Sequence, residues 1–311
     1  MRYALIASAL VASAQAHGLI RWVYGANGVK MPGLTVIDGT PRNCAVNACG
    51  SQADTGIIRD QDINANKAGA LGKTQGHGSV DAETNVAVWC GNKPAHAAPA
   101  NKGAEDSVGV EDALGAFAPP QQQKKEKRSK ARRQSMLDSL LGGASNLPII
   151  GITGIGATKD MSGMPKTENI ISATAAKGKG EGQCNLPTCG KDGIIEVGWF
   201  QVNQDGAGPL TGAVDCTSGG KDPKAFKTAQ VVQNAPGSGI SGLSVATLVE
   251  YQVKVKMPAE CKKCTGKLGG ADNVCVVRVR NNALAGPFGG SGAFTCNMEG
   301  GAKKRSVVFE A

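Results

Sequence analysis

The sequence predicts an all-β protein, an immunoglobulin-like antiparallel β-sandwich with long loops and a disordered basic insertion. Glycine is abundant, at 44 residues, and aromatic residues make up only 4% of the chain. This composition is typical of short strands joined by tight turns. Several segments alternate apolar and polar residues with a period of two, and turn-forming sequences separate them. Such spacing favours a sandwich over alternating strands and helices.

The clearest predicted strand covers residues 248–257, which have one apolar face and one polar face and are followed by Pro258. Residues 274–280 repeat this pattern, with Cys275, Val277 and Val279 on one side and Arg278 and Arg280 on the other. Further strands are expected at 194–203 and 306–310. Turns are expected at DGAGP (205–209), SGG (218–220), APGSG (235–239) and GPFGGSG (286–292).

Residues 1–16 (MRYALIASALVASAQA) are interpreted as a secretory signal peptide that ends in an A-x-A cleavage site. Cleavage after Ala16 leaves His17 with a free α-amino group beside its imidazole. An amine with a pKa near 8 and an imidazole with a pKa near 6.5 together form a bidentate nitrogen chelate for a metal. The alternative is that His17 is simply the first ordered residue of a surface strand.

The expected domain organisation is one sandwich domain formed by residues 17–118 and 146–311, with a low-complexity insertion at 119–145. Its tract 121–134 (QQQKKEKRSKARRQ) holds seven cations and one glutamate, so it supplies most of the net charge of +9. This tract cannot bury apolar surface, which predicts disorder. Because the rest of the chain is close to neutral, nucleic-acid binding is not expected.

The chain has ten cysteines, which in an exported protein favours disulfides. Two C-x4-C pairs and one C-x2-C pair also allow a zinc interpretation. Local disulfides are expected at 44–49 and 184–189, and Cys275 and Cys296 are expected to join neighbouring strands. No later run of about 18 apolar residues predicts a membrane span. We therefore expect a secreted monomer, either extracellular or at the cell surface.

The chain contains three histidines: His17, His77 and His96. A histidine brace uses the N-terminal amine, its imidazole and a second imidazole, and these nitrogen ligands suit Cu(II). His77 is favoured as the second ligand because glycine flanks it on both sides, and His96, in a loop of small residues, is the alternative. Phe294 is the candidate axial aromatic, whereas Phe288 is expected to pack in a turn; each is first a candidate core residue.

Other enzyme classes have weaker support. No G-x-S-x-G elbow, phosphate loop, dinucleotide fingerprint or H-E-x-x-H pair occurs. A glycosidase needs a pair of carboxylates, but the spacing of the candidate acids specifies no pair. These candidates are Asp54, Asp60, Asp62, Asp205 and Asp215.

Several long segments together resemble one known family. They are HGLIRWVYGANGVKMPGLTVIDGTPRNC (17–44), ACGSQADTGIIRD (48–60), ALGKTQGHGSVDA (70–82), QVNQDGAGPLTGAVDCTSGGKDP (201–223) and NVCVVRVRNNALAGPFGGSGAFTC (273–296). They resemble the fungal Egh-type virulence factors, secreted proteins associated with appressoria and haustoria. This resemblance implies an extracellular or cell-surface fungal protein that is linked to host penetration.

A second resemblance, to lytic polysaccharide monooxygenases, suggests which residues form a site. It rests on His17, the strand segment 277–280, the dipeptide Ala293-Phe294 and the loop 77–80. It implies a copper-dependent oxidase acting on cell-wall polysaccharide, with copper held by His17 and His77. Phe294 would shield the axial position, and Gln201, Asn203 or Arg278 would supply hydrogen bonds around it. The alternative hypothesis is a non-enzymatic effector or wall-associated protein whose loops bind cell walls or host surfaces.

Overall fold

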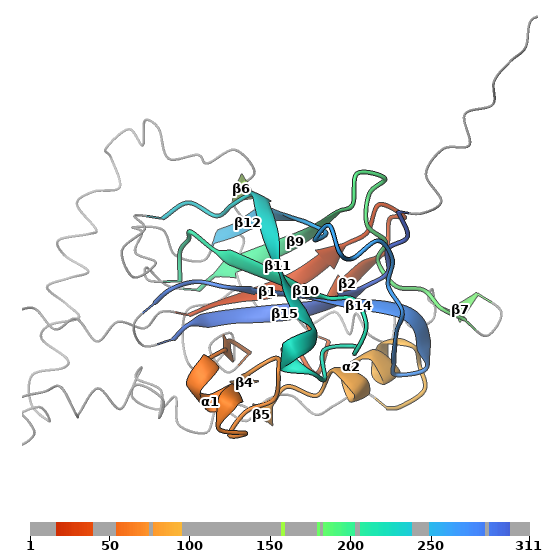
Figure 1. Cartoon of the computed structure of the whole chain (residues 1–311), viewed down its shortest axis with the longest axis horizontal. Helices are drawn as coiled ribbons and strands as arrows, with labels where there is room; N and C mark the ends of the chain where they lie inside the picture. The colour runs from red at the N-terminus through yellow and green to blue at the C-terminus, as the bar shows by residue number, and fades with distance from the viewer. Residues whose placement is uncertain are drawn as a thin grey trace, which may run out of the picture.

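The computed structural model describes residues 17–39, 54–74, 77–94, 157–158, 179–180, 183–202, 206–237, 249–283 and 286–298. Most of their regular structure is antiparallel β, in a 13-stranded sheet and a separate two-stranded sheet (Figure 1). The predicted all-β class is therefore confirmed. Residues 306–310, also predicted as a strand, lie outside the described residues.

The larger sheet has the strand order β2-β1-β9-β12-β11-β10-β14-β15-β3-β4-β5, with β13 paired to β14 and β6 paired to β12. The two-stranded sheet pairs β7 with β8. The strands are β1 (Gly18–Tyr24), β2 (Lys30–Pro32), β3 (Gly56–Ile57), β4 (Lys73–Thr74), β5 (Gly78–Ser79), β6 (Ala157–Thr158), β7 (Lys179–Gly180), β8 (Gln183–Cys184), β9 (Ile194–Gln201), β10 (Thr211–Asp215), β11 (Phe226–Gln233), β12 (Val249–Lys256), β13 (Gly266–Leu268), β14 (Ala271–Arg280) and β15 (Phe288–Phe294). The helices are α1 (Asp60–Asn64), α2 (Ala82–Trp89) and the short 3-10 helix η6 (Pro223–Ala225).

The larger sheet curls so that its two halves pack face to face. The main hydrophobic core lies between them and contains residues of β1, β9 and β12 from one half and of β10, β14 and β15 from the other. Strands β10 and β11 are hydrogen-bonded to each other, so the two halves are continuous. This continuity differs from the two separate sheets expected of an immunoglobulin-like sandwich.

The predicted strands at 194–203, 248–257 and 274–280 are found as β9, β12 and β14. The turn predicted at 286–292 is wrong, because β15 begins at Phe288 and pairs with β14 through Gly292 and Gly290. Its glycines made it look like a turn, but they allow the backbone of β1 to approach closely. A Cβ on Gly290 would lie 2.6 Å from the backbone nitrogen of Ile20.

Helix α2 forms a third layer on the outer face of β14 and β15, and in Figure 1 both α-helices lie on this side of the sheet. Asp81 begins α2 by accepting a hydrogen bond from the Thr84 backbone nitrogen at 3.1 Å, as N-cap residues do. Val86 and Trp89 of α2 pack against Val276 of β14 in a second hydrophobic core. No helix among the described residues is long and apolar enough to cross a membrane.

The disulfides of the described residues join segments that are distant in sequence. The pairs are Cys90–Cys184, Cys189–Cys296, Cys216–Cys261 and Cys264–Cys275. The expected 184–189 bridge is wrong because Cys184 lies beside the C-terminal end of α2. The expected link between Cys275 and Cys296 is wrong because each faces a loop cysteine instead. The 44–49 pair lies outside the described residues.

One polar position on the predicted outer face of β12 is buried. Glu250 is 4% exposed, forms an ion pair with Arg21 and accepts a hydrogen bond from the Tyr24 hydroxyl at 2.5 Å. Gly198 leaves room for this contact, since a Cβ there would lie 2.5 Å from a Glu250 carboxylate oxygen. Burial, followed by the Glu250 charge, raises the pKa of Tyr24 well above its ordinary value. This network holds β1, β9 and β12 together on their outer side.

We predict that Gly290→Ala destabilises the fold, because the new methyl group would overlap the backbone of β1. Overpacking of this kind costs about 1–3 kcal/mol or more. The matched control is Gly69→Ala, where a Cβ meets no atom within 4 Å. Urea denaturation of the two variants measures the difference. Equal unfolding free energies for both variants would show that the β1–β15 approach is not tight.

Candidate functional site

The backbone of His17 is fixed at the start of β1. Its carbonyl accepts a hydrogen bond from the Val202 nitrogen at 2.9 Å, and the next residue, Gly18, is in register with Gln201 of β9. A Cβ on Gly18 would lie 2.3 Å from the ring of Trp199. The Trp199 indole donates to the Gly206 carbonyl at 2.9 Å and is itself held in place. Packing against Trp199 therefore explains why glycine follows His17.

The His17 side chain is buried against Phe288. It is 1% exposed in the full chain, and the centres of the two rings are 5.0 Å apart at an interplanar angle of 32°. This separation is normal for contacting aromatic rings. Phe288 is fully buried and packs with Ile57 and Ala283. The aromatic beside the candidate ligand is thus Phe288, which the sequence analysis had assigned to a turn.

Phe294, the expected axial residue, lies at the opposite end of β15. It is six residues beyond Phe288, which corresponds to about 20 Å along a strand. Its strand partner is Cys275, and it belongs to the main hydrophobic core. The structure therefore places Phe294 in a packing position away from His17. The sequence pattern did not distinguish the two phenylalanines because both flank the same glycine-rich segment.

The two other expected site residues have different positions. Gln201 is fully buried at the end of β9, directly across from Gly18, so the structure brings it to the His17 end of the sheet. Arg278 lies on the opposite face of β14 from Val279, whose partner Gly290 shares a face of β15 with Phe288. The Arg278 guanidinium donates to the Ala70 carbonyl at 2.5 Å and lies 4.3 Å from the centre of the Phe226 ring. Arg278 is therefore directed away from His17.

Arg278 has a structural environment that explains its lowered basicity. Burial, and next the repulsion from Arg280, lowers the pKa of Arg278 to about 10. Arg280 in turn pairs with both carboxylate oxygens of Asp60, at 2.7 and 2.9 Å, and donates to the Ile58 carbonyl at 2.8 Å. The two arginines attach the segment that contains α1 to the outer face of β14.

His77 is half-buried immediately before β5, and its backbone nitrogen donates to the Thr74 hydroxyl at 3.1 Å. Strand pairing connects this hairpin to β15, because Thr74 pairs with Gly56 and Gly56 pairs with Gly289. His77 thus precedes the residue of β5 that is in register with Gly289 of β15 through Gly56 and Thr74, and β3 and β4 lie between the two strands. His96 and Asn203 lie outside the described residues.

The candidate carboxylates serve structural roles where the structure describes their contacts. Asp60 pairs with Arg280, and Asp62 pairs with Lys73 at 3.2 Å. Asp215 is fully buried, and its carboxylate accepts hydrogen bonds from a turn. Asp205 lies outside the described residues. Within the described ranges, no three His, Cys, Asp or Glu side chains gather as a metal site. A metal here would depend on two histidines and the N-terminal amine.

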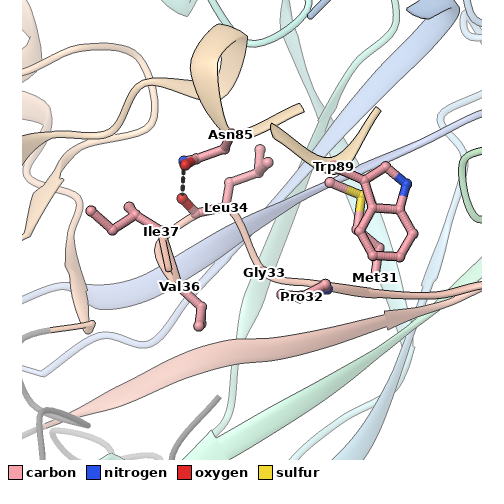
Figure 2. Close-up of a pocket in the computed structure, with 8 residues that line it drawn as sticks. All are labelled: Met31, Pro32, Gly33, Leu34, Val36, Ile37, Asn85 and Trp89. Atoms are coloured by element: carbon pink, nitrogen blue, oxygen red, sulfur yellow. Dashed lines mark hydrogen bonds between the residues drawn. The ribbon is translucent and has the colours of Figure 1, made fainter. Parts of the chain in front are cut away.

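Figure 2 shows a hollow between residues 31–37 and α2. The Asn85 amide donates to the Leu34 carbonyl at 2.5 Å, and Trp89 and Met31 close the other side. Its volume of about 10 Å³ has room for about one water molecule. The hollow is therefore too small to hold a sugar unit.

Comparison with known proteins identifies the family. The family model described as Egh16-like virulence factor matches residues 15–289, which include His17, His77 and Phe288. The chain belongs to the Egh16-like virulence factor family. It is 42% identical to the appressoria-specific virulence factor GAS2 of Pyricularia oryzae, over 99% of this chain and 93% of that relative. No solved structure matches the chain.

A more distant relative covers a smaller part of the Egh16-like chain. The appressoria-specific virulence factor GAS1 of Pyricularia oryzae is 31% identical over 135 residues, which is 43% of this chain and 48% of that relative. The resemblance to the Egh-type family expected from the sequence segments is therefore confirmed.

The Asp215 carboxylate organises the turn that follows β10. It accepts hydrogen bonds from the backbone nitrogens of Thr217 and Ser218 at 2.9 Å and of Gly220 at 2.7 Å. Burial alone would raise the pKa of Asp215, but the hydrogen bonds outweigh it and hold the pKa below its usual value. Asp215 is a candidate acid by sequence, whereas its contacts make it a structural anion.

We predict that Asp215→Asn lowers the unfolding free energy at pH 7 by about 2–4 kcal/mol, because charge-assisted hydrogen bonds to buried donors are lost. The folded-state pKa is lowered, so the wild-type advantage is fully present above the unfolded value of about 3.9 and disappears as the pH falls through the folded value. Urea denaturation at pH 7 and at about pH 2.5 should therefore show a shrinking difference. The control Asp272→Asn removes an exposed ion pair with Lys267 and should change stability by less than about 1 kcal/mol. A pH-independent difference for Asp215→Asn would contradict the role of the charge.

Proposed function

We propose that this Egh16-like protein is secreted and acts at the host or fungal cell wall during penetration. Two relatives are named as appressoria-specific virulence factors, which supports a role in infection. Four disulfides among the described residues support folding in an oxidising compartment. Residues 1–16 have the pattern of a signal peptide with cleavage before His17.

We further propose that His17 begins a copper site and that the protein is an oxidase of cell-wall polysaccharide. The observation that carries this proposal is the His17 ring, which lies against Phe288 immediately before β1. The nitrogen ligands would be the His17 amine and imidazole and the imidazole of His77. Copper held by such nitrogen ligands would supply oxidative chemistry with dioxygen or peroxide.

The residues around His17 have separable roles in this proposal. The buried Phe288 ring keeps water from one side of the imidazole. Gln201 stands next to the N-terminus on β9 and offers an amide for hydrogen bonds around the ligands. Phe288 therefore replaces Phe294 as the aromatic proposed to shield the site, and Arg278 has no proposed role there.

One observation favours a second candidate function, a non-enzymatic wall-binding or effector protein. His17 is 1% exposed in the chain that still carries residues 1–16. If the ring stays buried after processing, a polymer cannot reach it, and its contact with Phe288 is then a packing contact. Binding through surface loops would be the remaining activity.

We predict that processed protein with His17 as its first residue binds one equivalent of Cu(II) tightly. Isothermal titration calorimetry measures the affinity. His77→Ala should weaken binding by about 100-fold or more, since even residues that merely support metal ligands contribute 10–100-fold. His96→Ala should leave the affinity unchanged.

The matched control is a protein with one additional glycine before His17. It keeps every side chain but moves the α-amine away from the imidazole, so tight binding should be lost. Equal affinity with and without this glycine would contradict the copper site. Equal affinity of His77→Ala and His96→Ala would exclude His77 as a ligand.

A further inference from the structure

A ligand-sized hollow lies at the other end of the sheet from His17. Its volume is about 530 Å³, within the range of small-ligand sites. One wall is formed by the turn after β10, η6 and the start of β11, and the other by the loop after β12. Its lining includes Thr217, Lys224 and Lys227 from the first wall and Lys262, Lys263 and Thr265 from the second.

The length of strand β12 gives the distance between the His17 end of the sheet and the end with the hollow. Val249, its first residue, pairs with Gln201 of β9, which on its other side pairs with Gly18 of β1. Lys256, its last residue, leads into the loop that lines the hollow. Eight residues of extended strand span about 24 Å. The hollow is therefore separate from the His17 site.

The two walls are covalently joined. The disulfide Cys216–Cys261 lines the hollow, and the Thr265 nitrogen donates to the Cys216 carbonyl at 2.8 Å. The turn of the first wall is held by the buried Asp215 carboxylate. A hollow with such fixed walls loses little conformational freedom when it binds a ligand.

The charge of the hollow is positive. Four lysines line it against two acids, Asp222 and Glu260. Asp222 already caps η6 by accepting a hydrogen bond from the Lys224 nitrogen at 2.9 Å. Lys224, Lys227 and Lys262 form no ion pair within the described residues. In contrast, other exposed lysines form ion pairs with acids: Lys221 pairs with Glu83, and Lys267 pairs with Asp272.

We propose that this basic groove, defined by Lys224, Lys227, Lys262 and Lys263, binds an acidic polysaccharide. The ammonium groups would contact carboxylates of successive sugar units from both walls. Thr217 and Thr265 add polar groups to the lining, and no aromatic side chain is among the lining residues. The polyanion chemistry follows from the groove itself, whereas the choice of a wall polysaccharide among polyanions rests on the proposed function.

The test compares two variants with the same net charge. Lys227→Glu/Lys262→Glu reverses one cation on each wall, and Lys67→Glu/Lys93→Glu reverses two exposed lysines elsewhere. The basic tract 121–134 contributes the same background to both. Binding of polygalacturonate at about 0.1 M salt, where charges act over about 10 Å, is measured by biolayer interferometry. We expect the groove variant to bind about five- to tenfold more weakly than the wild type, and the control to stay within about twofold.

Equal affinity of the two variants for polygalacturonate would overturn the proposal, because binding would then follow net charge and not the groove. Weaker binding of the groove variant to duplex DNA, with polygalacturonate binding unchanged, would also overturn it in favour of a nucleic-acid partner. The copper proposal is tested independently of the groove proposal. The groove variant should titrate with Cu(II) like the wild type, and His17→Ala should bind polygalacturonate like the wild type.

Discussion

The close approach of β1 to the glycine-rich strand β15 is the constraint on which the structure depends. Gly290 and Gly292 have no side chains, so β1 can lie against β15; a Cβ on Gly292 would lie 2.2 Å from a Val23 methyl carbon. This contact closes the curled sheet around the main core. Because Ile20 meets Gly290 and Val23 faces Gly292, the two strands run side by side in the same direction. The same alignment brings His17, at the start of β1, to Phe288, at the start of β15.

Buried and partly buried charges then hold the outer surfaces of the sheet. Arg21, Tyr24 and Glu250 join the outer faces of β1 and β12 across the bare backbone of Gly198. On the other side, Arg278 and Arg280 hold the segment that contains α1 and leads to the hairpin of His77. Removing one partner of a buried ion pair is costly, because the other charge stays buried. The hairpin of His77 is attached to the sheet by strand pairing through β3, and the arginine contacts hold the segment that leads to it.

The parts of the fold that sequence reasoning found are those with a periodic pattern. Alternation in residues 248–257 and 274–280 predicted β12 and β14, since one face of each strand meets the core. Strand β15 was missed because its glycines serve a contact between strands far apart in sequence, which no local pattern reports. Helix α2 was missed although Asp81 gives a capping signal, because its apolar residues face a sheet on one side and a disulfide-linked loop on the other.

Strand pairing and strand direction decide where the candidate site residues lie. His17 and Gln201 are brought to one end of the sheet by the pairing of β1 with β9. Phe294 and Arg278 were assigned to the site from motif position, but strand direction places the first about 20 Å from Phe288 and strand alternation turns the second to the opposite face. The disulfides were mispaired because local spacing carries no information about which loops meet.

The most direct measurement of the central claim is a crystal structure of the secreted protein with copper. The account predicts that the chain begins at His17, that its ring lies on Phe288, and that the ligating nitrogens of His17 and His77 are about 4 Å apart, as two metal–nitrogen bonds of about 2 Å require. A mature chain that begins at another residue, or histidine rings that are too far apart to share one ion, would contradict the account.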